Sequence, residues 1–189
     1  MELSRELLSL LQQKRMPKHS PILVRIFKEE SELEVWKQDV TGHFQLLKVY
    51  PICRWSGDLG PKLHEGDRQA PEGFYTITSQ LMNPNSNYYL AINTGFPNSF
   101  DRANDRDGTF LMVHGDCWSS GCYAMTDEQI GEIYSARPRR ATRQPTVIPD
   151  PGLSIPFDAG ELGAASNQSE HGLLEDAQDR QRSFRGDAS

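Results

Sequence analysis

One stretch of this 189-residue chain decides its fold: Val113-His114-Gly115-Asp116-Cys117-Trp118-Ser119-Ser120-Gly121-Cys122, which continues an apolar run from Phe110. Residues 110–114 have the length and apolar character of a buried strand, so His114 is expected at the end of that strand. Cys122 follows eight residues later. A loop of that length can fold back and bring an imidazole to a sulfur, and cysteine acyl transfer needs that pairing of a base with a thiol.

A helix is predicted just past Cys122. Thr126, followed three residues later by Gln129, forms a capping box, and the helix should run to about Ser135. The N–H groups and the macrodipole at a helix start favour an anion. This position therefore predicts thiolate character at Cys122.

The two glycines of the stretch, Gly115 and Gly121, permit tight turns at both ends of the loop. The N–H groups of Gly121 and Cys122 are candidate donors for an oxyanion hole, which stabilises the negative oxygen of an acyl-transfer intermediate. Zinc is the competing interpretation, since the stretch holds acceptable ligands in His114, Asp116, Cys117 and Cys122. The C-x4-C spacing and the lack of a second Cys/His cluster argue against it, so we expect neither a metal nor a cofactor.

The chain has three cysteines, Cys53, Cys117 and Cys122, and an odd count leaves at least one thiol free if any pair forms. Cys117 is either a buried thiol or the partner of Cys53 in an oxidising compartment. The second alternative leaves Cys122 free, as a nucleophile requires.

Segments on either side of the stretch predict a mainly β domain with short appendages. The expected strands are residues 22–27, 33–36 and 43–50 as an antiparallel meander, then 74–78, 88–93 and 110–114, with a long Gly/Pro-rich loop over 56–73. We divide the chain into an N-terminal helix and linker (1–20), a catalytic domain (21–136), a segment with room for one last strand or hairpin (137–157) and a polar, flexible tail (158–189).

Charge and hydropathy exclude two classes of partner. A net charge of -6 and a pI near 5.4 provide no basic surface for nucleic acid. No run approaches the roughly 20 apolar residues needed to cross a bilayer. The first 15 residues are periodic like a helix, unlike the unbroken apolar core of a signal peptide, so export requires a leader that was removed or a leaderless route.

Several blocks of sequence occur in order around the stretch. They are Ser56–Lys62, Glu65–Asp67, Pro71–Tyr75, Ala91–Asn98, Asp101–Ala103 and Leu111–Met125. Together they resemble the YafK-like branch of the YkuD-domain L,D-transpeptidases, over roughly residues 22 to 135.

The resemblance implies an α+β, mainly β fold, a YkuD-like β-sandwich with short helices beside the active site. It implies His114 as general base and Cys122 as nucleophile, with Ser120 and Gly121 completing the catalytic motif before the cysteine. The implied substrate is a peptidoglycan stem peptide, attacked at the bond after the L-centre of diaminopimelate to form an acyl-enzyme.

Members of this branch are associated with hydrolysis that detaches the outer-membrane lipoprotein of Braun from peptidoglycan. The resemblance therefore implies a periplasmic enzyme that resolves its thioester with water, with stem peptides and peptidoglycan-bound lipoprotein as partners. Two alternatives stay open. One is an L,D-transpeptidase that forms cross-links or exchanges D-amino acids, including the case of an enzyme secreted as an antibacterial effector. The other is a non-catalytic peptidoglycan-binding module.

The sequence departs from the wider family at positions beside the nucleophile. Ser120 stands where the family has His, Ala124 stands where it has Arg, and the loop between the catalytic residues is shorter. Substrate carboxylates must therefore find other cations, and the candidates are Arg102 first, then Arg54 and Lys62. Trp118 is expected to cover the pocket. Tyr88 and Tyr89 are candidates to line it, with Tyr89 expected to bind substrate, and one of the two must face the core if side chains alternate along the strand.

Overall fold

The computed structural model describes residues 3–137, 144–146 and 148–149 of the chain. Its helices are α1 (Arg5–Gln13), α2 (Ser99–Ala103) and α3 (Asp127–Ala136), with a 3-10 turn η1 (Ser79–Leu81). Its strands are β1 (Ile22–Phe27), β2 (Glu32–Gln38), β3 (Phe44–Pro51), β4 (Arg54–Trp55), β5 (Tyr75–Ile77), β6 (Met82–Ser86), β7 (Tyr89–Asn93), β8 (Met112–His114), β9 (Tyr123–Ala124), β10 (Gln144–Thr146) and β11 (Ile148–Pro149). The predicted α+β, mainly β class is confirmed.

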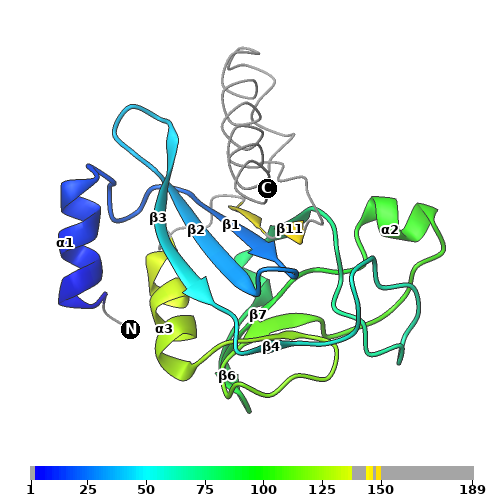
Figure 1. Ribbon diagram of the computed structural model, residues 1–189. Helices are drawn as coiled ribbons and strands as arrows, with labels where there is room; N and C mark the ends of the chain where they lie inside the picture. Colours follow the sequence, from blue (N-terminus) through cyan, green and yellow to red (C-terminus); the bar gives the residue numbers. More distant parts are fainter. Residues whose placement is uncertain (1–2, 138–143, 147, 150–189) are drawn as a thin grey trace, which may run out of the picture.

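The first sheet is the predicted meander. Strands β1, β2 and β3 pair antiparallel in that order, and β11 adds a parallel edge beside β1 (Figure 1). The bounds of β1 coincide with the apolar run that predicted it. Between Val35 and Trp36 the register shifts, because Leu47 is an extra, bulged residue in β3, and such a bulge increases the local twist.

The second sheet carries the His114 to Cys122 stretch. Its order is β4-β9-β8-β7-β6, and all its pairs are antiparallel except β8 with β9. Parallel neighbours usually need a crossover of a dozen or more residues, whereas here residues 115–122 suffice. The short connection turns through left-handed backbone at Asp116 (φ 71°), Cys117 (φ 46°) and Gly121 (φ 115°).

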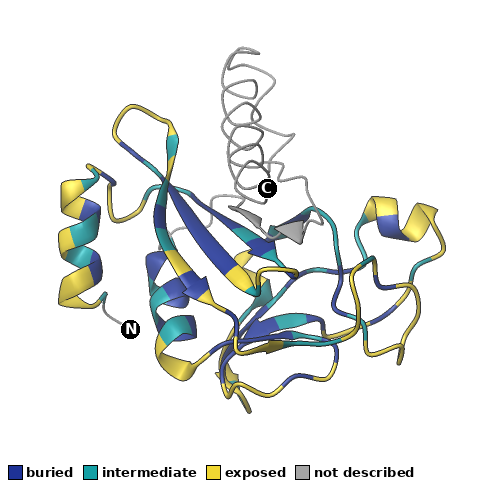
Figure 2. Ribbon diagram, in the orientation of Figure 1, coloured by how far each residue is buried: buried dark blue, intermediate teal, exposed yellow. Residues whose placement is uncertain are grey.

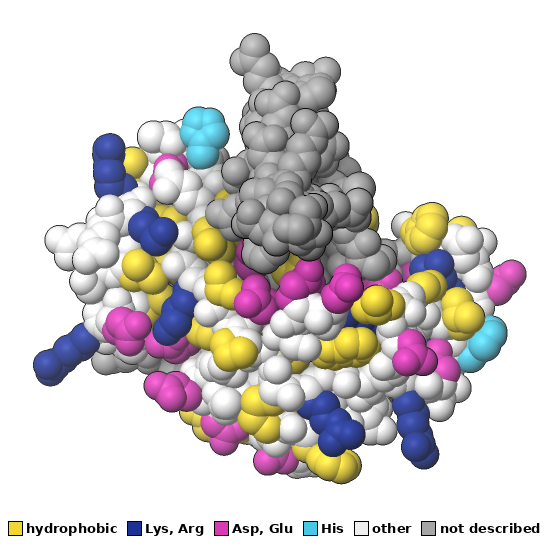
Figure 3. Space-filling view, in the orientation of Figure 1, with side chains coloured by type: hydrophobic (Ala, Val, Ile, Leu, Met, Phe, Trp, Pro, Cys, Tyr) yellow, Lys and Arg dark blue, Asp and Glu magenta, His cyan; other side chains and the backbone are white. Residues whose placement is uncertain are grey.

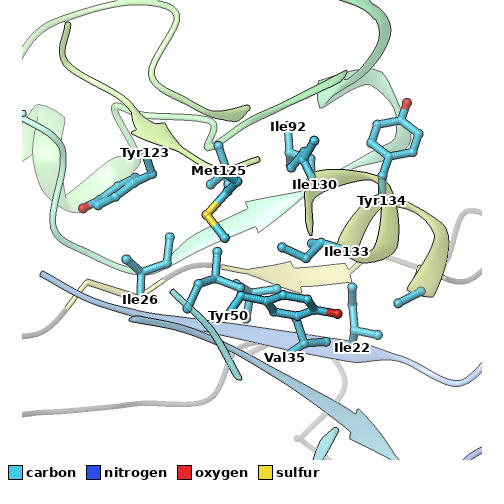
Figure 4. Close-up of a cluster of buried hydrophobic side chains, with 14 of the residues drawn as sticks. Ile22, Ile26, Val35, Tyr50, Ile92, Tyr123, Met125, Ile130, Ile133 and Tyr134 are labelled. Carbon is cyan, nitrogen blue, oxygen red and sulfur yellow. The ribbon is translucent and has the colours of Figure 1, made fainter. Parts of the chain in front are cut away.

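The core lies between the two sheets and α3. Figure 4 shows side chains of both sheets meeting those of the helix, and all the labelled ones are buried: Ile22, Ile26, Val35, Tyr50, Ile92, Tyr123, Met125, Ile130, Ile133 and Tyr134. In Figure 2, β2 is largely dark blue, whereas the turn between β2 and β3 is largely yellow. Because Tyr123 and Met125 belong to this core, the chain leaving Cys122 is held by packing, at roughly 1.5 to 3 kcal/mol for each fully buried large side chain.

Helix α3 begins and ends almost where the sequence predicts. Thr126 caps it: its hydroxyl accepts from the N–H of Gln129, and the Gln129 side chain accepts from the N–H of Thr126. The last residue, Ala136, offers its carbonyl to the Lys37 ammonium at 3.1 Å, and Lys37 also donates to the carbonyl of Ser20 at 2.7 Å. A fully buried lysine thus ties the end of α3 to β2, and burial lowers its pKa to about 8.

Other parts of the chain differ from expectation. The strands β4, β6 and β9 and the helix α2 were not predicted. Within 137–157, β10 pairs with β5 and β11 with β1, so the two do not form a hairpin with each other. The predicted tail, 158–189, lies outside the described residues.

Two surface properties bear on partners. Among the described residues, no helix has the length and apolar character to span a bilayer. On the face shown in Figure 3, Lys and Arg side chains stand singly among acidic, polar and apolar ones.

Candidate active site

The parallel pairing of β8 with β9 brings His114 and Cys122 to one face of the sheet. His114 lies opposite Ala124 in the register, so Cys122, two residues earlier, is its diagonal neighbour. Residues two apart on a strand point to the same face, and a diagonal pair lies roughly 7 to 8 Å apart, within reach of an aromatic side chain. The register thus places the two residues near each other in the sheet, and their action as a base–thiol pair stays a prediction.

The His114 imidazole is buried and held in one tautomer. Its side chain is almost fully enclosed, at 2% exposure, and the Tyr88 ring lies over it with the centroids 4.7 Å apart. Nδ1 donates to the carbonyl of Gly115 at 2.7 Å, so the unprotonated nitrogen is Nε2. Burial lowers the pKa of His114, against smaller raising effects of the Gly115 hydrogen bond and of Asp116. A neutral imidazole with a free Nε2 lone pair suits a general base.

The Cys122 thiol corrects the prediction of thiolate character. Burial raises its pKa above the ordinary value, and a backbone hydrogen bond at Met112 and the charge of Lys62 offset this only in part. The sulfur also lies 3.6 Å from the carbonyl oxygen of Phe110, an acceptor that favours the S–H form. The start of α3 is too far along the chain to dominate, because β9 intervenes and the helix dipole acts over about one turn. Cys122 therefore needs a base.

The Ser119 hydroxyl fixes the backbone of the cysteine. It accepts from the N–H of Cys122 at 3.0 Å, donates to the Cys122 carbonyl at 2.6 Å and lies 2.7 Å from the hydroxyl of Ser56. The N–H of Cys122, expected as an oxyanion donor, is thus engaged, whereas that of Gly121 makes no hydrogen bond within the described part of the chain. Neither Ser56 nor Ser119 was predicted. The three-residue offset between Ser119 and Cys122 is the local sequence signal that could have indicated this turn.

A disulfide joins Cys53 to Cys117, which decides between the alternatives left open for Cys117. Cys122 is the free thiol. The bond ties the middle of the loop to the segment between β3 and β4, and the neighbouring backbone adds hydrogen bonds from Cys53 to Ala124 (3.0 Å) and from Cys117 to Met125 (3.1 Å). It also removes Cys117 from the set of zinc ligands, and the described residues hold no metal-binding cluster of His, Cys, Asp or Glu.

Gly115 is required where the loop leaves β8. A Cβ at this position would lie 2.4 Å from Oδ1 of Asp127 and 2.9 Å from the carbonyl oxygen of Tyr88. The same Asp127 oxygen accepts from the N–H of Asp116 at 2.9 Å. The close approach thus lets the first turn of α3 hold the start of the loop.

Lys28 anchors the long loop beside the site. Its ammonium is 1% exposed, and it donates to the carbonyls of Asp58 (3.2 Å), Gly60 (3.0 Å) and Ala70 (2.9 Å) while pairing with Glu72 at 2.9 Å. Lys28, which directly follows β1, therefore holds three carbonyls and one carboxylate of the predicted loop over 56–73 in place.

Each predicted carboxylate-binding cation has a contact within the described residues, and its role toward a substrate stays a prediction. Arg102, in α2, donates to the carbonyl of Pro97. Lys62 is buried and pairs with Asp67, although its charge reaches Cys122. Arg54 lies over the Trp118 ring, 5.0 Å from its centroid.

The predicted aromatic residues lie at the surface. Trp118 is 60% exposed and contacts Arg54, with no contact to Cys122 among the interactions of the described residues. Tyr88 and Tyr89 are both exposed, so the expectation that one faces the core is wrong. The positive φ of Tyr89 (65°) breaks the alternation at the start of β7 and leaves Tyr88 over His114.

These features of sequence and fold define a class. The chain belongs to the YkuD family, the L,D-transpeptidase catalytic domain, whose family model matches residues 24–148. This is a family of cysteine-dependent enzymes. The particular relatives at 50% identity over 115 residues are two Escherichia coli proteins, from strains K12 and O157:H7, each named "Putative L,D-transpeptidase YafK". The match covers 61% of this chain and 46% of the relative, so the chain spans less than half the length of the curated relatives it matches.

Solved structures agree on the fold. The helical cell shape determining protein Pgp2 of Campylobacter jejuni superposes with a TM-score of 0.56 at 20% identity, covering 80% of this chain and 57% of Pgp2. Bd1075 of Bdellovibrio bacteriovorus gives a TM-score of 0.52 at 21% identity, covering 88% of this chain and 56% of Bd1075. At these identities the likeness establishes the YkuD-like architecture.

Proposed function

We propose that this chain is a cysteine-dependent enzyme that cleaves peptidoglycan stem peptides at diaminopimelate and resolves its thioester with water, detaching Braun-type lipoprotein. The observation that carries the proposal is the state of His114. Its Nδ1–H is committed to Gly115 and its pKa is lowered by burial, so Nε2 is available as a base. The pairing of His114 with Ala124, two residues after Cys122, supports Cys122 as the thiol that this base serves.

The reaction follows from these groups. Nε2 of His114 takes the proton of the Cys122 thiol as the sulfur attacks the carbonyl carbon of the L-centre of diaminopimelate. The N–H groups at Ser120 and Gly121 are the proposed donors to the resulting oxyanion. Collapse of the intermediate breaks the amide bond, and the departing amine takes the proton from His114. Water then attacks the thioester, gives a proton to His114, and leaves a free carboxylic acid and the restored thiol.

Water is favoured as the acceptor by the residues around the nucleophile. Ser120 and Ala124 stand where the wider family has His and Arg, which removes an imidazole and a cation from the acceptor side. The 50% identity to YafK proteins supports placing this chain in the YafK-like branch, which is associated with hydrolysis. The disulfide of Cys53 with Cys117 supports an oxidising compartment, and we propose the periplasm.

The test is mass spectrometry of sacculi treated with the protein, with Cys122→Ala as the control. Loss of bound lipoprotein together with stems that end in a free carboxylate supports hydrolysis. New cross-links or exchanged D-amino acids support the transpeptidase alternative. If both wild type and Cys122→Ala bind sacculi and neither changes them, the protein is a binding module and the proposal is contradicted. An effector role is separated by toxicity that appears only when the protein is directed to the periplasm.

A further inference from the structure

Arg68 lies beside the nucleophile, in the long loop between β4 and β5. Its Cα is 4.0 Å from the point where a Cβ on Gly121 would lie, and Gly121 directly precedes Cys122. The side chain is exposed, and within the described part of the chain it makes no hydrogen bond or ion pair. The backbone of a residue with open cationic donors thus lies against the residue that precedes the nucleophile.

The turn that carries Arg68 is fixed on its N-terminal side by Asp67. The Asp67 carboxylate accepts from the backbone N–H groups of Leu63 (2.9 Å), His64 (3.0 Å) and Gln69 (2.9 Å). It also pairs with Lys62, and these donors hold the pKa of Asp67 well below its usual range.

Gln69 fixes the turn on the other side. Its side chain accepts from the N–H of Asp58 at 2.8 Å and donates to the carbonyl of Gly60 at 2.8 Å. Between these anchors Arg68 has φ +56°, a left-handed conformation that costs energy in a residue with a Cβ. The loop therefore imposes a strained backbone on an arginine whose side chain makes no hydrogen bond or ion pair within the described residues.

Other cations of this region already have partners. Lys28 pairs with Glu72 at 2.9 Å, Lys62 with Asp67, and Arg106 with Asp101 at 3.1 Å. Arg54 is stacked on Trp118, and Arg102 is bonded to the Pro97 carbonyl. Arg68 has its full set of donors available.

We propose that Arg68 binds a substrate carboxylate next to the scissile carbonyl, and so selects stems that carry a free carboxylate there. The proposal rests on the proposed function. A planar guanidinium binds a carboxylate through two parallel hydrogen bonds, which fixes orientation as well as charge. A stem peptide offers two sources, the free carboxylate of diaminopimelate and that of a terminal D-amino acid in the leaving group.

The test compares three synthetic stems in kcat/KM: the unmodified tetrapeptide, one amidated on diaminopimelate and one amidated on the terminal residue. For wild type, amidation of the bound carboxylate is expected to lower kcat/KM by roughly 10- to 100-fold, the size of a charge-assisted hydrogen bond. Arg68→Gln should be slower by a similar factor on the unmodified stem and insensitive to that amidation. The amide that matters identifies the source. If amidation lowers kcat/KM in Arg68→Gln by the same factors as in wild type, the proposal is wrong.

Two further variants separate binding from folding. Arg68→Gly relieves the left-handed backbone, so it should unfold at the wild-type temperature or above while losing the same activity as Arg68→Gln. Arg15→Gln is the matched control: Arg15 is also exposed and left-handed (φ +54°), but it follows α1 at the outer edge of the molecule (Figure 1). It should behave as wild type.

Stem binding to Cys122→Ala, measured by calorimetry, keeps the inference separate from the reaction. If wild type cleaves neither these stems nor the lipoprotein linkage of sacculi, but Cys122→Ala binds the unmodified stem and loses affinity when Arg68→Gln is added, the proposed function fails and the site stands. If Cys122→Ala binds no stem, both are overturned.

Discussion

The hydroxyl of Ser119 holds both backbone polar groups of Cys122, accepting from its N–H at 3.0 Å and donating to its carbonyl at 2.6 Å. The nucleophile therefore sits in a closed turn whose geometry depends on one oxygen atom. Ser56, across the sheet, completes the arrangement through its 2.7 Å contact with that oxygen.

Ser119→Ala should lower kcat much more than it raises KM, because it leaves the two backbone groups without partners and displaces the sulfur. Unfolding should become easier by about 1 to 3 kcal/mol, the cost of leaving buried polar groups unsatisfied. Ser56→Ala removes only the outer contact and should have the smaller effect on both. Steady-state kinetics and denaturant unfolding check this, and equal effects of the two variants would contradict it.

The pH dependence of thiol reactivity tests the state of the pair. Burial lowers the pKa of His114 below 6.5, so the imidazole remains a neutral base under mildly acidic conditions and the acid limb of kcat/KM should fall below that value. Burial raises the pKa of Cys122, so in His114→Ala the alkylation rate should climb with pH through a midpoint above 9. A midpoint near neutrality in that variant would mean that the thiolate forms without the histidine.

The disulfide of Cys53 with Cys117 should support both folding and catalysis. Native protein should show one titratable thiol, and reduced, unfolded protein three. Cys117→Ser should cost about 2 to 4 kcal/mol of stability and lower kcat, since the loop before Cys122 loses its tie to β4. Cys53→Ser is the matched variant and should match it. Full activity in both variants would show that the loop needs no such tie.

Stability at alkaline pH reports on Lys37. Its pKa in the folded state is about 8, against an ordinary value of 10.5, so between these values the unfolded chain binds the proton and the folded protein does not. The free energy of unfolding contributed by Lys37 therefore rises from pH 8 toward pH 10, and is lost as pH falls through 8. Lys37→Met lacks this titration. From pH 8 to pH 10 the unfolding free energy of wild type should therefore increase relative to that of Lys37→Met. A difference that stays constant over this range would contradict the prediction.

Features with local sequence signals could be predicted from the sequence. The apolar run of β1 and the Thr126 to Gln129 capping box depend on neighbours in the chain, and both were confirmed. Strand β6 was missed because Met82-Asn83-Pro84-Asn85-Ser86 is polar and contains proline, so its pairing with β7 alone defines it.

The site was harder to predict because its properties depend on residues far apart in sequence. The thiol pKa was predicted in the wrong direction because burial of Cys122 by the loops around it outweighs the nearby helix start. The Ser56 to Ser119 contact joins positions 63 residues apart, and no spacing rule finds such a pair. Arg68 was not among the cations proposed from the sequence, because only the packed loop places its backbone against Gly121.

In the proposed reaction, Cys122 forms a thioester with a stem peptide after His114 takes its proton. Acid-quenched mass spectrometry at short reaction times detects such a thioester. We expect an acyl adduct on the peptide that contains Cys122, present in wild type, strongly reduced in His114→Ala and absent in Cys122→Ala. Turnover of the stem by Cys122→Ala, or an adduct on another residue, would contradict it.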